Sequence, residues 1–372
     1  MVQVKDIMSV MERIAPEKLA ENWDRPGLAV GDPKQEVKKI LVALDVTGAV
    51  VEEAVALGAD MIVTHHPMLL FQKLDRITAD TPLGQKIFQL ITHGIAAFSA
   101  HTNLDVVKGG TNDVLAERIG LQDVQILEET WKEPLKKIVI YVPLTHAEVV
   151  RDAMCRAGAG QIGRYACCTF GAEGIGTFLP LEGTNPYLGS AGKLEQAAEL
   201  RLETIVPAPL TAQVLSEAIA AHPYEEVAYD IYPVEQTVRR EGIGRIGSLP
   251  QELPFAVFAE RLKTQLQLDR IRVTGDGQKR IRRIALCTGS GAEYLSLAHR
   301  MGADAYLTGD IKFHEAQKAV EAGLCVADVT HYASEVLIVP ILQRKLQEAA
   351  EENGWALEVI CSNVDGQTFW TL

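Results

Sequence analysis

The segment KILVALDVTGAVVEEAVALGADMIVTHH, residues 39–66, decides the fold class of this chain of 372 residues. It predicts a strand at Ile40–Leu44, a helix at Ala49–Leu57 and a second strand at Met61–Val63. Both strands are almost continuously apolar, which is typical of parallel strands that are buried on both faces of a sheet. The segment therefore predicts a β-α-β unit of an α/β fold.

A second segment, RIALCTGSGAEYLSLAHRMGADAYLTGD at residues 283–310, repeats this pattern. Gly58-Ala59-Asp60 recurs as Gly302-Ala303-Asp304, and Thr64 recurs as Thr308 at the same offset. A fixed offset over a whole β-α-β unit indicates that the chain carries two related α/β halves. Because open α/β sheets bind ligands at the carboxyl ends of their strands, polar residues that follow these strands are the first candidates for a site.

Residues 130–235, between the two halves, have a different pattern. They predict these strands and helices: Lys137–Leu144, His146–Ala157 (helix), Tyr165–Phe170, Gly174–Leu179, Ala197–Ile205, Thr211–Ala221 (helix) and Val227–Tyr232. The succession indicates the β-α-β-β-α-β order of a ferredoxin-like α+β insert. The flanks Leu127–Lys136 and Pro233–Pro250 are charged or glycine-rich and are interpreted as linkers. We therefore expect a split α/β domain at 1–129 and 236–372, interrupted by the insert.

Composition narrows the classes of function. Hydrophobic residues make up 47% of the chain and charged residues 23%, as in packed globular proteins. The net charge of −13 argues against broad binding to nucleic acids or anionic membranes, which needs a basic face. The N-terminal MVQVKDIMSV has no signal-peptide pattern and no apolar stretch approaches ~20 residues, so we expect a cytoplasmic protein.

The cysteines form no C-x-x-C pair, and most of them lie in apolar runs. We expect buried, reduced thiols rather than a disulfide framework or a metal site. The residues concerned are Cys155, Cys167, Cys168, Cys287, Cys325 and Cys361.

Three polar clusters in the two halves each follow an apolar strand. They are Thr64-His65-His66-Pro67, His101-Thr102-Asn103-Leu104-Asp105 and His331-Tyr332-Ala333-Ser334-Glu335. Adjacent imidazoles at a strand end can point to different sides, which suits two metal ions. The i, i+4 spacing puts His331 and Glu335 on one helix face, where a glutamate with two oxygens can bridge two ions.

Each cluster alone also has a plain structural explanation. The first can be a turn that ends at a proline, the second a helix cap, and the third a surface histidine with an acidic first helical turn. Together, however, three histidines and two carboxylates match a dinuclear hydrolytic site with ions ~3.5–4 Å apart. We therefore predict two divalent metal ions, zinc in preference to iron or manganese, on His65, His66, Asp105, His331 and Glu335.

Four further residues are candidates for supporting these ligands or contacting a substrate: Asp45, His101, Asp310 and His314. Asp45 ends the first strand and can hold a ligating imidazole through its second nitrogen. Thr308-Gly309-Asp310, with His314, lies where the repeat places His65 and His66, so we expect Asp310 to face the same crevice. Ordinary loop structure is the alternative for these positions.

Three other motifs have no clear catalytic meaning. Residues 158–163 and 242–247 fit G-x-G-x-x-G, but neither has the preceding strand and following helix of a dinucleotide site, so we expect loops. His222-Pro223-Tyr224-Glu225-Glu226 in the insert predicts either a tight turn or a contact with a ligand or another subunit.

Taken together, the motifs resemble those of the GTP cyclohydrolase I type 2 homologues, also called NGG-interacting-factor-three-like proteins. The carrying motifs are Glu21-Asn22-Trp23-Asp24, Gly27-Leu28, Val63-Thr64-His65-His66-Pro67, Ser99-Ala100-His101-Thr102-Asn103-Leu104-Asp105, Thr308-Gly309-Asp310 and Val329-Thr330-His331-Tyr332-Ala333-Ser334-Glu335. The resemblance covers essentially the whole chain. The insert is similar to the middle domain of the longer bacterial form, which is itself similar to the PII and CutA proteins.

The resemblance implies a dinuclear metal centre on the same five ligands, with Glu335 as the bridge, in a toroidal homohexamer whose metal sites face an internal cavity. Two functions fit these expectations. The first is a metal-dependent hydrolase for a nucleotide or related small molecule, which in a GTP cyclohydrolase would attack C8 of the guanine ring. The second is a non-catalytic, metal-dependent binding or regulatory assembly, in which His222, Glu225 and Glu226 contact an effector. The acidic charge disfavours a DNA-binding factor.

Overall fold

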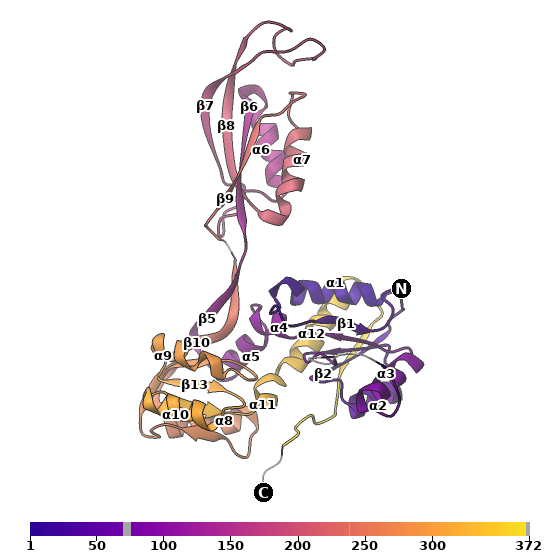
Figure 1. Ribbon diagram of the computed structural model, residues 1–372, viewed down its shortest axis with the longest axis vertical. Helices are drawn as coiled ribbons and strands as arrows, with labels where there is room; N and C mark the ends of the chain where they lie inside the picture. Colours follow the sequence, from indigo (N-terminus) through magenta and orange to yellow (C-terminus); the bar gives the residue numbers. More distant parts are fainter. Residues whose placement is uncertain (70–75, 238, 370–372) are drawn as a thin grey trace. The chain divides into compact units, whose positions relative to one another are not determined.

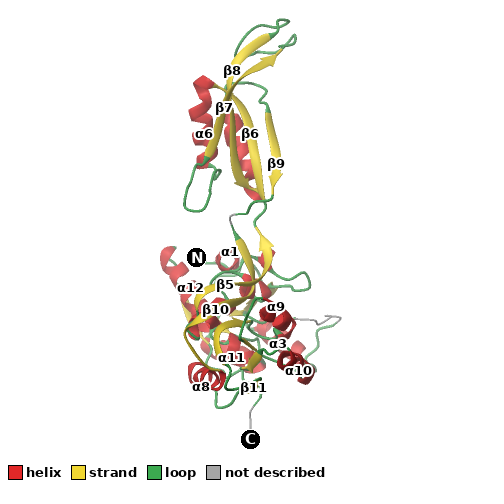
Figure 2. Ribbon diagram, turned by 90° about the vertical axis from the view of Figure 1, so that its left-hand side faces the viewer, coloured by secondary structure: helices red, strands yellow, loops and turns green. Residues whose placement is uncertain are grey.

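The computed structural model describes residues 1–69, 76–237 and 239–369. The chain forms two compact units, one made of Met1–Thr130 with Glu241–Leu372 and the other of Trp131–Arg240. Figure 1 follows the chain through both units by colour, and Figure 2 distinguishes their helices from their strands. Within the described residues, no helix has both the length and the apolar character that crossing a membrane requires.

The N-terminal half of the first unit has a five-stranded sheet with the order β1-β4-β3-β2-β15. Strand β1 is antiparallel to β4, and the other neighbours are parallel. The strands are β1 (Gly27–Val30), β2 (Lys39–Ala43), β3 (Met61–Thr64), β4 (Ala96–Ser99) and β15 (Glu358–Cys361). The helices are α1 (Val4–Ile14), the 3-10 turn η1 (Glu17–Leu19), α2 (Gly48–Leu57), α3 (Pro82–Thr92), α4 (Thr102–Val106) and α5 (Thr111–Arg118).

The second half has a six-stranded sheet with the order β11-β14-β13-β12-β10-β5. Its central strands β12, β13 and β14 are parallel, while β10 and β11 run antiparallel to their neighbours. The strands are β5 (Gln122–Lys132), β10 (Arg240–Pro254), β11 (Arg272–Thr274), β12 (Arg280–Leu286), β13 (Ala305–Thr308) and β14 (Cys325–Asp328). The helices are α8 (Phe255–Leu266), η4 (Ala292–Tyr294), α9 (Leu295–Arg300), α10 (Phe313–Glu321), α11 (His331–Glu335) and α12 (Ile338–Glu352).

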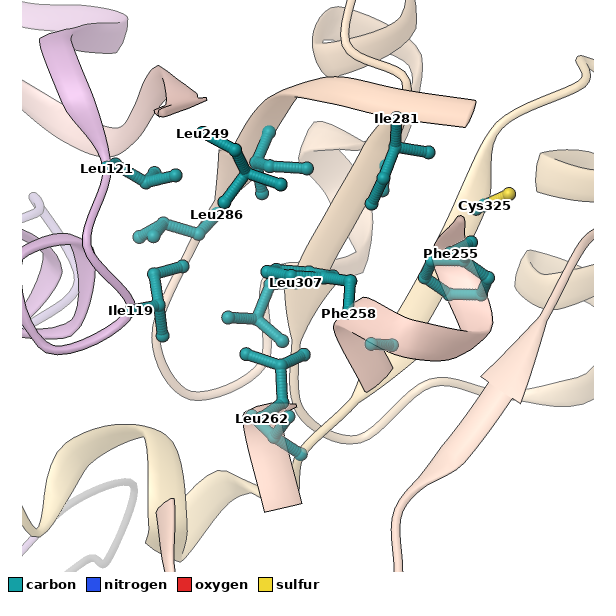
Figure 3. Close-up of a cluster of buried hydrophobic side chains, with 14 of the residues drawn as sticks. Ile119, Leu121, Leu249, Phe255, Phe258, Leu262, Ile281, Leu286, Leu307 and Cys325 are labelled. Atoms are coloured by element: carbon teal, nitrogen blue, oxygen red, sulfur yellow. The ribbon is translucent and has the colours of Figure 1, made fainter. Parts of the chain in front are cut away.

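A buried apolar cluster fixes α8 against this second sheet. Phe258 and Leu262 of α8 pack against Leu286 of β12 and Leu307 of β13, and Figure 3 shows these side chains together. All four are at most 2% exposed. Burial of large side chains of this kind contributes about 1.5–3 kcal/mol each. The cluster thereby fixes the carboxyl ends of β12 and β13, and β13 leads into the motif Thr308-Gly309-Asp310.

The two halves share a hydrogen-bond pattern at equivalent aspartates, which supports the internal repeat. The carboxylate of Asp60 accepts hydrogen bonds from the backbone N–H groups of residues 38 and 39, at 2.7 and 2.9 Å. The carboxylate of Asp304 accepts from residues 282 and 283, at 2.9 and 2.8 Å. Each aspartate, which lies just before its own strand, thus ties that strand to the preceding parallel strand, β2 in one half and β12 in the other.

The second unit is an antiparallel sheet with the order β7-β8-β6-β9 and two helices. Its elements follow one another in β-α-β-β-α-β order, apart from two 3-10 turns. They are β6 (Leu135–Pro143), η2 (Leu144–His146), α6 (Ala147–Arg156), β7 (Thr169–Phe178), β8 (Glu195–Pro207), η3 (Ala208–Leu210), α7 (Thr211–Ala220) and β9 (Tyr229–Val234). Alternate residues Ile138, Ile140 and Val142 of β6 share one buried core with residues of both helices.

Several local expectations are wrong. Residues 242–247 are not a loop but part of β10, and the flank 127–136 contributes to β5 and β6. A Cβ at Gly242 would clash with the carbonyl oxygen of Glu128, so the glycines allow β10 to lie close to β5. Two separate strands were expected at 165–170 and 174–179, but the chain forms the single strand β7. Residues 158–163 lie in a loop, as expected.

The cysteine expectation is also wrong in part. Cys155 and Cys167 form a disulfide, and Cys168 is a free, half-buried thiol. Cys155 lies in the last turn of α6, and Cys167 lies just before β7. The loop between them brings the two sulfurs together. Cys287 and Cys325 are buried free thiols, in agreement with their apolar surroundings.

Candidate metal centre

The predicted ligands come together where parallel strands of the two sheets end. His65 and His66 directly follow β3, and Asp105 lies in α4, which begins soon after β4. His331 and Glu335 are the first and last residues of α11, which follows β14. The carboxyl ends of parallel strands are where α/β sheets place ligands, so the two related halves each contribute side chains to one cluster.

Glu335 occupies the middle of the cluster and is 4% exposed. Its Oε2 lies 2.9 Å from Nε2 of His66 and 3.1 Å from Nε2 of His331. Its Oε1 lies 3.7 Å from Nε2 of His65. Ligand atoms of His66, His331 and Glu335 form one group that can hold a metal ion, and those of His65, Asp105 and Glu335 form another. Glu335 therefore belongs to both groups.

Two buried atoms of the cluster lack a satisfactory hydrogen-bond partner among the described residues. Nε2 of His65, which is fully buried, lies 3.6 Å from Oδ1 of Asp105, beyond hydrogen-bond distance. Oε2 of Glu335 has close imidazole nitrogens but no well-directed hydrogen bond. Buried polar groups are nearly always satisfied, so such atoms call for a partner of another kind. Converging nitrogen and oxygen lone pairs at these distances fit divalent cations.

Each histidine is held through its other ring nitrogen. Nδ1 of His66 lies 2.8 Å from Oδ1 of Asp45, and Nδ1 of His331 lies 2.8 Å from Oδ2 of Asp310. Nδ1 of His65 donates to the backbone carbonyl of Ala100 at 2.9 Å. These contacts orient all three Nε2 atoms toward the cluster, which is the usual arrangement behind a metal-binding imidazole.

Two further histidines were expected near the site, and only one of them is there. The ring of His101 lies 5.3 Å from that of His65 between centroids, and the two form a possible ligand group with His66. Nδ1 of His101 lies 3.1 Å from Asp24, which is buried. His314 is exposed in α10, where it contacts Gln317 and the ring of Phe313 instead of the cluster.

Sequence reasoning missed several supporting residues. Thr111 donates a hydrogen bond of 2.5 Å to Oδ1 of Asp105, and Thr288 lies 3.5 Å from the same oxygen. Gly289 has a φ of +65°, and a Cβ there would clash with Oε1 of Glu335. Of the missed residues, only Asp24 carried a signal, because it belongs to the Glu21-Asn22-Trp23-Asp24 motif.

Electrostatics within the cluster favour positive charge on the imidazoles. Burial lowers the pKa of His66, but the adjacent carboxylates of Asp45 and Glu335 outweigh it and raise that pKa to about 10. Glu335 raises the pKa of His331 to about 9. Burial raises the pKa of Glu335, yet His65 and the other imidazoles lower it well below its usual value. The cluster therefore attracts cations, whether protons or metal ions.

Two backbone positions beside the cluster are strained. Asp310 has a φ of 55° and Thr330 a φ of 72°, which non-glycine residues rarely adopt. Thr330 immediately precedes His331, and Asp310 holds that histidine through Nδ1. Strained conformations of this kind concentrate at functional sites, where the surrounding structure must hold them in place.

A cavity of about 730 Å³ opens beside the second ligand group. His66, His331 and their partners Asp45 and Asp310 line it. The side chains of Arg270 and Arg272 line it as well, and Arg272 forms an ion pair with Asp328. The cavity therefore combines a candidate metal group with guanidinium groups that can bind an anion.

Comparison with known proteins identifies the family of the chain. The family model described as Duf34/NIF3 (NGG1p interacting factor 3) matches residues 2–367. A relative from Bacillus subtilis, named GTP cyclohydrolase 1 type 2 homolog, is 40% identical over 99% of this chain and 98% of its own length. A relative of the same name from Mycobacterium tuberculosis is 38% identical over 90% of this chain and 88% of its own.

Solved structures give the same result. The crystal structure of a Bacillus cereus protein related to NIF3 has a TM-score of 0.90 and 41% identity, and covers 100% of this chain and 99% of its own. A Staphylococcus aureus protein has a TM-score of 0.84 and 28% identity, with 100% and 99% covered. These likenesses confirm the expected α/β fold class and the family resemblance. The chain belongs to the DUF34/NIF3 family.

Proposed function

We propose that the chain binds two divalent metal ions per subunit and hydrolyses a small anionic molecule such as a nucleotide. The observation that supports this most is the position of Glu335, whose two carboxylate oxygens face different histidines. One ion would be held by His65, Asp105 and Glu335, and the other by His66, His331 and Glu335. Zinc suits this set of nitrogen and oxygen ligands, and iron or manganese would also fit.

Paired divalent ions supply Lewis acidity, which polarises a substrate oxygen and lowers the pKa of water. The remaining work belongs to side chains of the chain itself. Asp45 and Asp310 hold the imidazoles of His66 and His331 in position through their Nδ1 atoms. Arg270 and Arg272 offer guanidinium groups to a phosphate or carboxylate in the adjoining cavity. A guanine nucleotide is one substrate with such an anionic group, in keeping with the name that the relatives carry.

The test is turnover by purified protein loaded with zinc or manganese, using GTP and a panel of phosphoesters as substrates. Activity is expected with the native protein and is expected to be lost in His65→Ala. His314→Ala is the matched control, because its imidazole lies outside the cluster. If the native protein turns over no substrate faster than His65→Ala, the catalytic part of the proposal is wrong.

A non-catalytic binding or regulatory role is the second candidate. The nearby carboxylates favour this role. Asp45 and Asp310 each contact Nδ1 of an imidazole, so they are poorly placed to act as general bases. In that case metal analysis would still find bound ions, while the substrate panel would give no turnover. The two outcomes separate metal binding from catalysis.

We further propose that the subunits assemble as a homohexamer with the metal centres facing an enclosed space. The proposal of a hexamer rests on the family resemblance. Light scattering on the purified protein is expected to give about six times the chain mass of 40.6 kDa. A monomeric mass at micromolar concentration would rule the hexamer out.

A further inference from the structure

The insert unit contains a cavity of about 430 Å³ that is separate from the metal ligands. It lies among β6, β7, β8 and the turn after α7, which carries the His222-Pro223-Tyr224-Glu225-Glu226 motif. Its wall includes several aromatic and acidic side chains. They are Phe178, Tyr187, Tyr224, Glu199, Glu225 and Glu226.

The aromatic rings form a connected wall around Tyr224. The ring centroids of Phe178 and Tyr224 are 5.9 Å apart, and those of Tyr187 and Tyr224 are 6.0 Å apart. Neither pair is stacked face to face, since their planes are inclined by 54° and 42°. Tyr187 is 52% exposed, so its ring is accessible to a ligand. The face of an aromatic ring carries partial negative charge, so these rings can attract a cation that reaches their faces.

A carboxylate lies deep in the same wall. Glu199 of β8 is only 9% exposed, and its Oε1 accepts a hydrogen bond of 2.9 Å from the hydroxyl of Tyr224. A Cβ at residue 176 would clash with Oε2 of Glu199, so the glycine found there leaves room for the carboxylate. Burial of a charged group is costly without a partner, and one phenol satisfies only part of its capacity.

The acidic side chains have no basic neighbour among the described residues that line the cavity. Glu199, Glu225 and Glu226 line the cavity, and among its described lining residues there is no lysine or arginine. Neighbouring His222 is fixed as a neutral tautomer, because it donates from Nε2 to the carbonyl of Tyr141 and accepts at Nδ1 from the backbone N–H of Tyr224. Burial lowers the pKa of His222, which agrees with this neutral form.

We propose that this cavity binds a small organic cation, an ammonium group with apolar substituents. Aromatic faces attract a desolvated ammonium ion, and the buried carboxylate of Glu199 supplies a matching charge. A bare metal ion fits less well, because the aromatic wall offers rings where a metal needs several nitrogen or oxygen ligands. The motif at residues 222–226 would then shape a ligand site, since His222 holds the backbone of Tyr224 in place.

The test uses calorimetric titration of the full-length protein with choline chloride, at constant ionic strength. The matched probe is 3,3-dimethylbutan-1-ol, which has nearly the same shape and no charge. Choline is expected to bind saturably and the neutral alcohol at least tenfold more weakly. Equal binding of the two probes, or no binding of choline, would overturn the proposal.

Two variants locate the binding. Glu199→Gln is expected to weaken choline binding about tenfold or more, and Tyr187→Leu about fivefold, which corresponds to ~1 kcal/mol for one cation–π contact. Glu173→Gln is the control, because Glu173 lies on β7 outside the cavity lining. Circular dichroism checks that each variant is folded. Unchanged choline affinity in the folded Glu199→Gln protein would refute the assignment. If Glu199→Gln does not fold, the choline affinity of Tyr187→Leu and the comparison with the neutral alcohol test the assignment instead, and an unchanged affinity in Tyr187→Leu would refute it.

Discussion

Nδ1 of His66 and Oδ1 of Asp45 lie 2.8 Å apart, so a carboxylate that follows β2 orients an imidazole that follows β3. The other half of the first unit contains the same relationship, between His331 and Asp310, at the same distance. In both pairs the aspartate leaves Nε2 facing Glu335. Each half of the first unit thus uses an aspartate to orient one imidazole toward Glu335.

Asp45→Asn is expected to lower the affinity for the metal held by His66 about 10–100-fold, because an amide orients the imidazole less well and makes it a weaker ligand. Competition with a chromophoric chelator measures the change. Asp80→Asn provides the control, since Asp80 is exposed and belongs to none of the ligand groups. Equal affinity in Asp45→Asn and the native protein would show that the hydrogen bond has no role in binding.

The shared position of Glu335 leads to a prediction about stoichiometry. Asp105→Asn removes a ligand from one group only, so about one ion per chain is expected to remain. Glu335→Ala removes a ligand from both groups, so both ions are expected to be lost or greatly weakened. Elemental analysis after dialysis gives the counts. Two retained ions in Glu335→Ala would exclude Glu335 as the bridge.

The architecture could be predicted from the sequence because its strands are short, apolar and repeated. The β-α-β units at 39–66 and 283–310 are both present, and the fold class and family are confirmed. The errors occurred where tertiary contacts override local signals. Gly242 suggested a loop, but it is glycine because β5 lies against it.

The candidate site, too, could be predicted from the sequence only in part. His65, His66, Asp105, His331 and Glu335 were chosen from their places after strands, and the structure brings them together, although metal binding stays a prediction. Thr111 and Gly289 could not be chosen in this way. Their roles depend on how α5 and the loop after β12 approach Asp105 and Glu335, and no local pattern records that approach.

Metal binding is expected to release protons in the neutral to alkaline range. In the metal-free protein the pKa of His66 is about 10 and that of His331 about 9, so both imidazoles are protonated at pH 8. A metal ion binds only the neutral form, so each of these two imidazoles loses its proton on binding, and the apparent affinity rises with pH until the pH passes these values.

Calorimetry in two buffers with different protonation enthalpies measures this release. His66→Ala is expected to release about one proton fewer than the native protein. A binding enthalpy that is independent of the buffer would contradict the raised pKa values.

The equivalent aspartates of the two sheets predict matched losses of stability. Asp60 and Asp304 each accept two hydrogen bonds from backbone N–H groups of the neighbouring segment, so each substitution by alanine leaves two N–H groups without that partner. A cost of about 1–3 kcal/mol is expected for each variant. The two residues lie in different sheets and share no hydrogen-bond partner, so the double variant should lose about the sum of the two. Urea unfolding measures the free energies, with Asp80→Ala as the control. A large loss in one half and none in the other would mean that the repeated hydrogen bonds stabilise the halves differently, despite their common geometry.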